Sequence, residues 1–511
     1  MTGIKRLLTD TIIYGFTTIV SRLLNFLLTP IFVSRLRDVA VYGIFTHLYA
    51  CISLLNAVLA FGMETTFFRY LQKVKPEDKG KVYDQAFLIT LLTSLLVGFL
   101  IFSNQSQIAA WLSQGDGHSD YVIYVQLLLG VLVTDALAVV PFAKLRAEGR
   151  AIRYAIVKIL NIIITLGSNL TFLYLFPKLM VTSTFWNEFL SSWFRPDWVL
   201  GNIFMANLIA SGSTLLLLLP QLASLRLRID TSLVKSMLNY SFPILIANIS
   251  FIINEYLDKI IFPFLLPGKE GEDALGVYGA VSKLAVFIAL FVTAFRLGAE
   301  PFFFAYAKNE NAKKTYANIM LYLVLFLVIG MLGICANLDW LKYFLKTDDP
   351  VEQALFWSGL SIVPVLLFNY VLLGIYMNLS IWYKLTDQTR YGLYISVIGA
   401  IITIALNIVV IPRYSYVGAA LCTTVTYLCM ISLSYFWGQK NYPIPYTVSK
   451  ISLYLLSAII LSAIMQGPLN SNFWWCNLLL VVYVAAVAIS EKAMIMRLWK
   501  GAAKASNQPS K

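Results

Sequence analysis

Long apolar stretches follow one another along almost the whole chain, with short polar segments between them. Each is close in length to the roughly 20 residues that an α-helix needs to cross about 30 Å of hydrocarbon. The pattern predicts about fourteen transmembrane helices, near residues 8–33, 40–63, 84–103, 120–142, 154–176, 201–222, 237–264, 274–302, 314–336, 352–376, 390–411, 416–436, 448–466 and 472–490. We therefore expect an all-α integral membrane protein without a separate soluble domain.

The composition agrees with this expectation. Of the 511 residues, 59% are hydrophobic and 13% are charged, and the mean hydropathy is +0.74. These values lie outside the range of soluble globular domains. The first apolar stretch is too long for the core of a signal peptide and lacks a small-residue cleavage site, so we expect it to be retained as a helix.

The basic residues are distributed unevenly between the two sides of the predicted bundle. With the amino terminus inside, most of the 39 Lys and Arg fall in inner segments, as the positive-inside rule requires of cytoplasmic loops. We therefore expect a multi-pass protein of the cell inner (plasma) membrane with both termini in the cytoplasm. Topology and attraction to anionic lipid account for the net charge of +13, so no nucleic-acid partner is expected.

Residue types that carry enzymatic or metal chemistry are sparse. The five cysteines lie in predicted spans without a CxxC motif or a Cys/His cluster, so we expect free thiols, no metal and no cofactor. His47 and His118 are isolated, which leaves no catalytic triad to assemble. No Walker A sequence is present, so ATP hydrolysis is not expected. The sequence thus predicts a protein without catalytic residues.

A short internal echo predicts two related halves. The segment TPIFVSRLRDVAVYG at 29–43 resembles FPFLLPGKEGEDALGVYG at 262–279, because both contain a proline, a short outer loop and then Val-Tyr-Gly. Both halves start inside, so the repeat is parallel, an arrangement that places a substrate site between two bundles. The chain divides into three parts on this interpretation: a six-helix lobe at 1–222, a second at 223–440, and two further helices with a cytoplasmic tail at 441–511.

Charged side chains persist deep in several predicted helices, where each is costly unless it faces protein or water. In the first span, Arg22 has Asn25 on the same helical face. Arg22 either pairs with an acid on a neighbouring helix or lines an anion pathway. In the seventh span, Glu255 and Lys259 have the i,i+4 spacing of an ion pair. That pairing would leave Asp258 to bind a cation on another helix or to take up a coupling proton.

The eighth span and the inner rim add further basic residues. Lys283 and Arg296 lie about 20 Å apart along one helix. They either bracket one pathway, or Arg296 forms a local pair with Glu300 one turn away. At the inner rim, four basic residues would form a cytoplasmic vestibule that gathers anionic head groups through its field, although an ordinary positive-inside loop explains them equally well. These vestibule residues are Arg69, Lys144, Arg146 and Arg150.

Several segments resemble those of Wzx-type polysaccharide and O-antigen flippases, in the multidrug/oligosaccharidyl-lipid/polysaccharide (MOP) exporter superfamily. The segments are IKRLLTDTIIYGFTTIVSRLLNFLLTPIF, VYGIFTHLYA, FGMETTFFRYL, PFAKLRAEGR and ALNIVVIPRYSYVGAALCTTVTY. The resemblance covers nearly the whole chain. It implies two six-helix lobes in a V that open alternately to either side of the membrane, plus two extra C-terminal helices that form a groove for a lipid tail.

The substrate implied by this resemblance is an undecaprenyl-diphosphate-linked oligosaccharide, a repeat unit of O-antigen, capsule or exopolysaccharide. In related flippases, arginines on helices one and eight line the central cavity. Arg22 matches the first-helix pattern, although Asn25 stands where those relatives commonly have glycine, and Arg296 is the candidate on helix eight. We expect Arg22, Arg296, Lys283 and Asn25 to hold the diphosphate. Membrane lipid and other polysaccharide-assembly proteins are the remaining partners that we consider, and we expect a monomer.

Three other interpretations remain open from the sequence, one of which is a scaffold without transport activity whose charges in the membrane serve only assembly. A drug/cation antiporter of the same superfamily would share the helices but should have an acidic cavity, whereas the first helix here offers an arginine. A membrane glycosyltransferase or polysaccharide polymerase should have an acidic motif in an outer loop or a large outer domain, and we find neither. The sequence therefore favours a flippase that works by alternating access.

Overall fold

The computed structural model describes residues 17, 19, 20, 23, 26–113, 120–226 and 228–492, without the side chains of residues 301 and 305. These residues form helices and no strands, and twelve helical segments are long and apolar enough to cross a membrane. One of the twelve, Arg390–Asn441, contains a break at Ser415, where the backbone is non-helical. It therefore contains two of the expected spans, and most of the predicted first span lies outside the described residues. The all-α membrane fold is confirmed.

The first half of the chain contains the helices that the pattern predicted, with short additions at their ends. α8 continues through a π-helical turn into α9, so one helical segment runs from Ala151 to Thr182. The helices of this half are α2 (Thr29–Leu36), α3 (Val39–Ala60), α4 (Met63–Lys73), α5 (Lys79–Ser103), α6 (Gln105–Leu112), α7 (Tyr121–Ala147), α8 (Ala151–Leu170), α9 (Phe176–Thr182), α10 (Thr184–Ser191), α11 (Val199–Leu217) and α12 (Leu219–Leu222).

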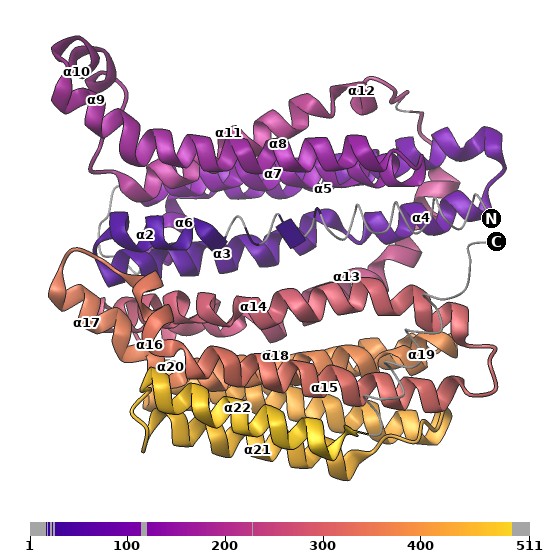
Figure 1. The fold of residues 1–511 in the computed structure, drawn as a ribbon. Helices are drawn as coiled ribbons and strands as arrows, with labels where there is room; N and C mark the ends of the chain where they lie inside the picture. Colours follow the sequence, from indigo (N-terminus) through magenta and orange to yellow (C-terminus); the bar gives the residue numbers. More distant parts are fainter. Residues whose placement is uncertain are drawn as a thin grey trace, which may run out of the picture.

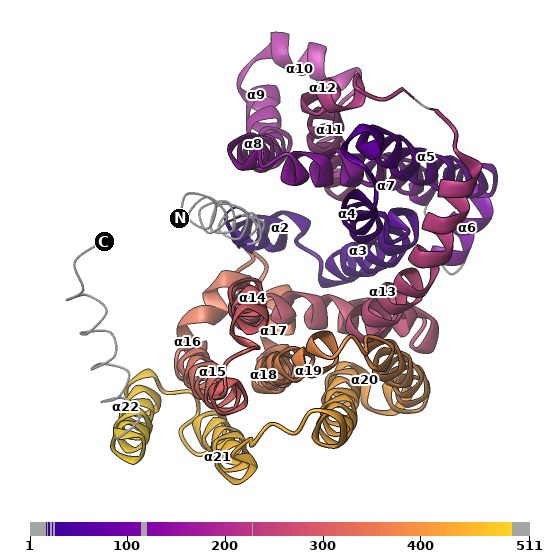
Figure 2. The ribbon, with the colours of Figure 1, turned by 90° about the vertical axis from the view of Figure 1, so that its right-hand side faces the viewer.

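The second half contains longer helices and ends in the two additional ones. These helices are α13 (Thr231–Leu265), α14 (Lys269–Tyr306), α15 (Ala312–Ala336), α16 (Leu338–Leu341), α17 (Pro350–Ser358), α18 (Val363–Leu379), α19 (Ile381–Leu385), α20 (Arg390–Asn441), α21 (Val448–Gln466) and α22 (Phe473–Ser490). α21 and α22 pack on α15, on the side of this half away from the first (Figure 2). They thus extend the second bundle outward into the lipid.

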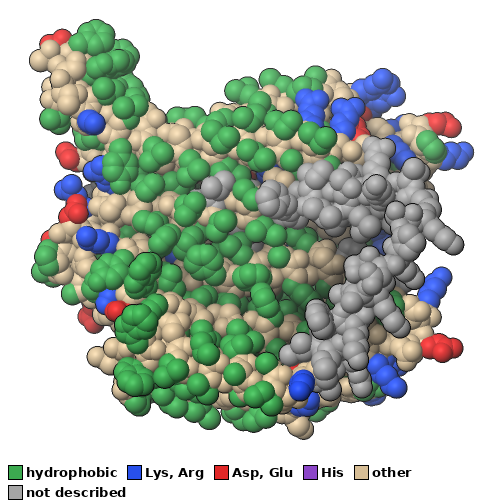
Figure 3. Space-filling model, in the orientation of Figure 1, with side chains coloured by type: hydrophobic (Ala, Val, Ile, Leu, Met, Phe, Trp, Pro, Cys, Tyr) green, Lys and Arg blue, Asp and Glu red, His purple; other side chains and the backbone are tan. Residues whose placement is uncertain are grey.

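The long helices run roughly parallel to one another (Figure 1). An apolar surface covers the middle of the molecule, and charged side chains gather at its two ends (Figure 3). α4 and α19 lie at the end that our topology assigns to the cytoplasm, whereas α10 and α17 lie at the opposite end. We refer to these as the predicted cytoplasmic end and the predicted outer end.

Viewed along the helices, α3–α12 form one group and α14–α20 form another, with α13 between them (Figure 2). α13 packs on α3, α4 and α5 of the first group and on α14 and α20 of the second. The Asp230 carboxylate caps its amino terminus by accepting hydrogen bonds from the backbone N–H groups of Ser232 and Leu233. The Leu233 bond and the contacts with Ser232 hold the pKa of Asp230 below its usual value.

The two groups meet most closely where α3 crosses α14 near the predicted outer end. Gly43 of α3 lies so close to Glu272 that a Cβ at this position would overlap the Glu272 carbonyl oxygen. Gly276 of α14 likewise lies against the Val39 carbonyl oxygen, and Gly279 lies against Thr46. Glycine permits this approach because it has no Cβ. The two Val-Tyr-Gly segments that echo each other in sequence therefore lie at this close crossing of the two groups.

We predict that Gly276→Ala separates α3 from α14, because the new methyl group would overlap the backbone of Val39. Spin labels on cysteines that replace Arg37 and Lys269 should report a longer distance by electron paramagnetic resonance. Gly212→Ala in α11 is the matched control, since nothing lies within 4 Å of a Cβ there. It should leave the distance unchanged and stabilise the helix by about 0.5–1 kcal/mol. The same distance in both variants would contradict a glycine-dependent closure.

Candidate functional site

A central chamber of about 400 Å³ lies between the two groups of helices, below the glycine crossing. Its walls come from α2, α3, α13, α14, α18 and α20, with Thr165 of α8 and Asn207 of α11 at one side. Four of the charged residues singled out in the sequence line this chamber: Glu255, Asp258, Lys259 and Lys283. The seventh and eighth predicted spans thus contribute charged residues to one site.

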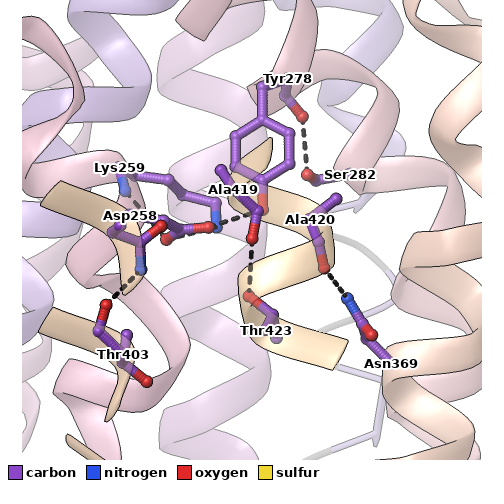
Figure 4. A network of polar contacts seen from close by, with 10 residues as sticks. Asp258, Lys259, Tyr278, Ser282, Asn369, Thr403, Ala419, Ala420 and Thr423 are labelled. Atoms are coloured by element: carbon purple, nitrogen blue, oxygen red, sulfur yellow. Dashed lines mark hydrogen bonds and ion pairs between the residues drawn. The ribbon is translucent and has the colours of Figure 1, made fainter. Parts of the chain in front are cut away.

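Asp258 forms the best-defined polar contact of the chamber (Figure 4). Its carboxylate lies 3.1 Å from the Lys259 ammonium nitrogen and accepts a 2.6 Å hydrogen bond from the Tyr278 hydroxyl of α14. Asp258 is 5% exposed and Lys259 16% exposed, so water screens this pair only weakly. Lys259 also lies 4.7 Å from the centre of the Tyr278 ring. The neighbouring residue Asp258, rather than Glu255 at i−4, therefore neutralises Lys259, which corrects the pairing inferred from spacing.

A ladder of neutral polar groups continues behind Asp258 and joins α13 to α20. The Asn254 side-chain amide donates to the Ser396 carbonyl oxygen at 3.2 Å, and its oxygen accepts from the Thr403 hydroxyl at 3.1 Å. Thr403 in turn lies 3.1 Å from the hydroxyl of Thr426. These buried groups satisfy one another, so they hold the helices that carry the chamber wall instead of facing a ligand.

Lys283 differs from Lys259 in its surroundings. It lines the chamber from α14, about 20 Å from the start of that helix. Among the described residues, no acid lies within 4.0 Å of its ammonium group, and no hydrogen bond or aromatic ring is recorded for it. Lys259 lines the same chamber but carries the same charge, so it does not neutralise Lys283. An ammonium group that has no protein partner at membrane depth favours an anionic ligand in the chamber.

The structure does not bring all the predicted anion-binding residues together. Arg22 and Asn25 lie outside the described residues. Arg296 lies further along α14, beside a small cavity of about 20 Å³ between α14, α18 and α19, where its guanidinium is 3.8 Å from the Met377 sulfur. Glu300 pairs with Lys384 at 2.8 Å and not with Arg296. Arg296 and Lys283 therefore lie in separate cavities in this conformation.

The four vestibule residues are paired within the predicted cytoplasmic rim. Arg146 binds Glu64 across the helices, Arg150 lies 3.1 Å from Glu148, and Lys144 lies 3.9 Å from the same carboxylate. The Arg69 guanidinium stacks 4.3 Å from the centre of the Tyr240 ring. Two carboxylates, Glu64 and Glu148, therefore offset part of the charge of the four basic residues, and Arg69 has an aromatic ring as its partner.

Sequence reasoning missed two charged residues of the first half. Asp135 in α7 and Lys158 in α8 both line a second cavity, which lies beside the central chamber. Asp135 lies near the middle of the span predicted at 120–142, and its charge and depth were the signal that could have identified it. Lys158 lies only a few residues inside the span predicted at 154–176, so it resembled an ordinary residue of a helix end.

Comparisons with known proteins agree on the type of fold. Residues 232–409 match the MatE family model, and no curated protein matches the chain in sequence. Among solved structures, the chain resembles the lipid II flippase MurJ in an inward closed conformation, with a TM-score of 0.71, 15% identity, and coverage of 95% of this chain and 100% of that one.

Two multidrug transporters share the fold as well. A multidrug resistance MATE family transporter of the MOP superfamily, inward-facing, has a TM-score of 0.60, 15% identity, and coverage of 85% of this chain and 95% of its own. A mutant of the Vibrio cholerae MATE transporter VcmN has a TM-score of 0.60 and 15% identity, with 86% and 98% covered. The chain thus shares its fold with a lipid II flippase and with multidrug transporters.

We predict that Asp258→Asn lowers the unfolding temperature of the purified protein in detergent, because the buried Lys259 ammonium loses its counter-ion. Breaking such a pair on one side costs about 3–5 kcal/mol. Combining it with Lys259→Met should recover most of the loss, since removing both partners leaves no buried charge behind. A double variant as unstable as Asp258→Asn alone would show that the ion pair does not determine the stability of this region.

Proposed function

We propose that this chain is a transporter of the MOP exporter superfamily that translocates an undecaprenyl-diphosphate-linked oligosaccharide across the inner membrane. The shared fold supports a transporter of this superfamily, and the MatE match over residues 232–409 agrees with it. The observation that carries the choice of an anionic substrate is Lys283, whose ammonium group faces the central chamber without a partner among the described residues.

The charges of the chamber support this choice. Asp258 and Lys259 neutralise each other, so the remaining charged groups of the chamber are the Lys283 ammonium and the Glu255 carboxylate, and Lys283 is the basic group that can bind an anion. A diphosphate offers several oxygens that accept charge-assisted hydrogen bonds from such a group and replace the water that it loses. Arg22 would add a second permanent cation, because its guanidinium stays charged and binds phosphate oxygens in pairs. We keep Arg22 in the proposed site on the strength of the sequence resemblance.

The close crossing of α3 and α14 near the predicted outer end supports access from the opposite side. In our proposal the diphosphate enters from the cytoplasmic side. Binding then draws the lobes together around Lys283, and separation of α3 from α14 releases the sugar outside. No nucleotide-binding loop is present in the sequence, so the energy comes from the membrane potential, an ion gradient or removal of the product.

An antiporter of cationic drugs is the second candidate, and the two carboxylates Glu255 and Asp258 in the chamber favour it. Asp258 is already neutralised by Lys259 and bonded to Tyr278, which weakens this candidate. Efflux of a cationic dye from a transporter-deficient host separates the two functions. A flippase should confer no efflux, whereas efflux that disappears in Asp258→Asn would support the antiporter.

We predict that Lys283→Met lowers transport of the lipid-linked oligosaccharide in proteoliposomes by roughly 10- to 100-fold. A hydrogen bond to a charged group contributes about 1.5–3 kcal/mol, and about 1.4 kcal/mol corresponds to tenfold in binding. Lys283→Arg should retain much of the activity, because it keeps the charge.

Lys269→Met is the matched control, since it removes an exposed lysine from the first residue of the same helix. It should transport at the wild-type rate, and protein abundance should be equal in all variants. Wild-type transport by Lys283→Met would remove the main support for an anionic substrate in this chamber.

A further inference from the structure

A second chamber of about 430 Å³ lies inside the first group of helices, between α3, α7, α8 and α11. Its volume falls in the range of about 300–1,000 Å³ that is usual for small-molecule sites. It reaches from the ion pair of Arg146 and Glu64 at the predicted cytoplasmic rim to Tyr49, Thr165 and Asn207. These last three residues also line the central chamber, so the two cavities adjoin.

Two charged residues of this second chamber, Asp135 and Lys158, form no ion pair within 4.0 Å among the described residues, whereas Arg146 and Glu64 at its rim pair with each other. Asp135 lines this cavity together with Ser211, and no basic nitrogen of the described residues lies within 4.0 Å of its carboxylate. The Lys158 ammonium lies 4.3 Å from the centre of the Phe142 ring and is likewise not within 4.0 Å of an acid. Both groups keep hydrogen-bonding capacity that faces the cavity. At this depth such groups require water or a polar ligand.

The neutral side chains of the wall also offer hydrogen-bond donors and acceptors to the cavity. Asn161 donates to the Thr214 hydroxyl at 2.8 Å and to the Ala210 carbonyl oxygen at 3.2 Å, which leaves its own amide oxygen to accept. The Asn207 amide donates to the Tyr49 hydroxyl, and its oxygen remains available at the junction of the two chambers. Hydroxyl-rich ligands need this mixture of donors and acceptors, spread over several walls.

Aromatic rings complete the wall near Lys158. The rings of Phe142 and Tyr154 meet edge to face, with centroids 5.3 Å apart, and both residues line the chamber. The chamber thus combines apolar ring surfaces, which suit the C–H faces of a sugar, with carboxylate, amide and ammonium groups, which suit its hydroxyls. A site that only takes up and releases a proton at one carboxylate would need neither a cavity of this volume nor its amide side chains.

We infer that the second chamber binds the first sugars of the transported lipid, while Lys283 in the adjoining central chamber binds the diphosphate. This inference rests on the proposed function. Asp135 and Lys158 would then select the cargo by hydrogen bonds to its hydroxyl groups. A site built to bond a substrate hydroxyl discriminates strongly against an analogue that lacks it, because its own polar groups are then left unpaired.

The test compares two lipids in proteoliposomes: undecaprenyl diphosphate carrying the oligosaccharide, and undecaprenyl diphosphate without sugar. Asp135→Asn and Lys158→Met should each lower transport of the glycosylated lipid by roughly tenfold or more, the effect of one bond to a charged group. Both variants should move the sugar-free lipid at the wild-type rate. Lys283→Met should impair both lipids, because they share the diphosphate.

Asp120→Asn is the matched control on the chain segment that leads into α7, since Asp120 pairs with Arg195 at the predicted outer end, away from the chamber. It should change neither rate, and unfolding temperatures should show that all variants are folded.

Equal effects of Asp135→Asn on both lipids would overturn the sugar site. A shifted pH dependence with an unchanged sugar preference would overturn it too, in favour of a proton site formed with Lys158, Glu64, Arg146, Tyr49, Tyr154 and Ser211. Failure of the wild-type protein to move either lipid would overturn the proposed function and, with it, this inference.

Discussion

The high cost of an unpaired charge in hydrocarbon governs the interior of this protein. Each ionised group at membrane depth must either meet an opposite charge or border a polar cavity. Asp258 and Lys259 follow the first course, since they neutralise each other beneath Tyr278. Lys283, Asp135 and Lys158 follow the second, since each lines a chamber and none forms an ion pair among the described residues. Asp258 and Lys259 are thus neutralised within the protein, whereas the other three groups border cavities.

The sequence predicted the helices well, because apolar stretches of membrane length are a strong local signal. The break at Ser415 coincides with the gap expected between the spans at 390–411 and 416–436. The partners of charged residues were harder to predict, since spacing along one helix says little about neighbouring helices. Glu300 is one turn from Arg296, yet it binds Lys384 of α19. The chamber explains the unusual polarity of the seventh span, because Glu255, Asp258 and Lys259 all line it.

The two chambers give the first and second halves of the chain different tasks. The second half contributes the charged residues of the central chamber, on α13 and α14. The first half contributes a cavity rich in hydroxyl and amide groups between α3, α7, α8 and α11. α13, which carries Asp258 and Lys259, packs on both groups of helices. The two groups of helices thus border cavities with different chemistry.

The glycine crossing of α3 and α14 also bears on the energetics of opening. Helices gain little hydrophobic free energy by leaving lipid for each other, and glycine buries hardly any side-chain surface when they do. The contact at Gly43, Gly276 and Gly279 consequently brings the two helices very close together, but these glycines contribute little of the free energy that opposes their separation. A gate of this kind blocks water and lipid while closed, and it can still be released by a driving force as small as the binding of one ligand.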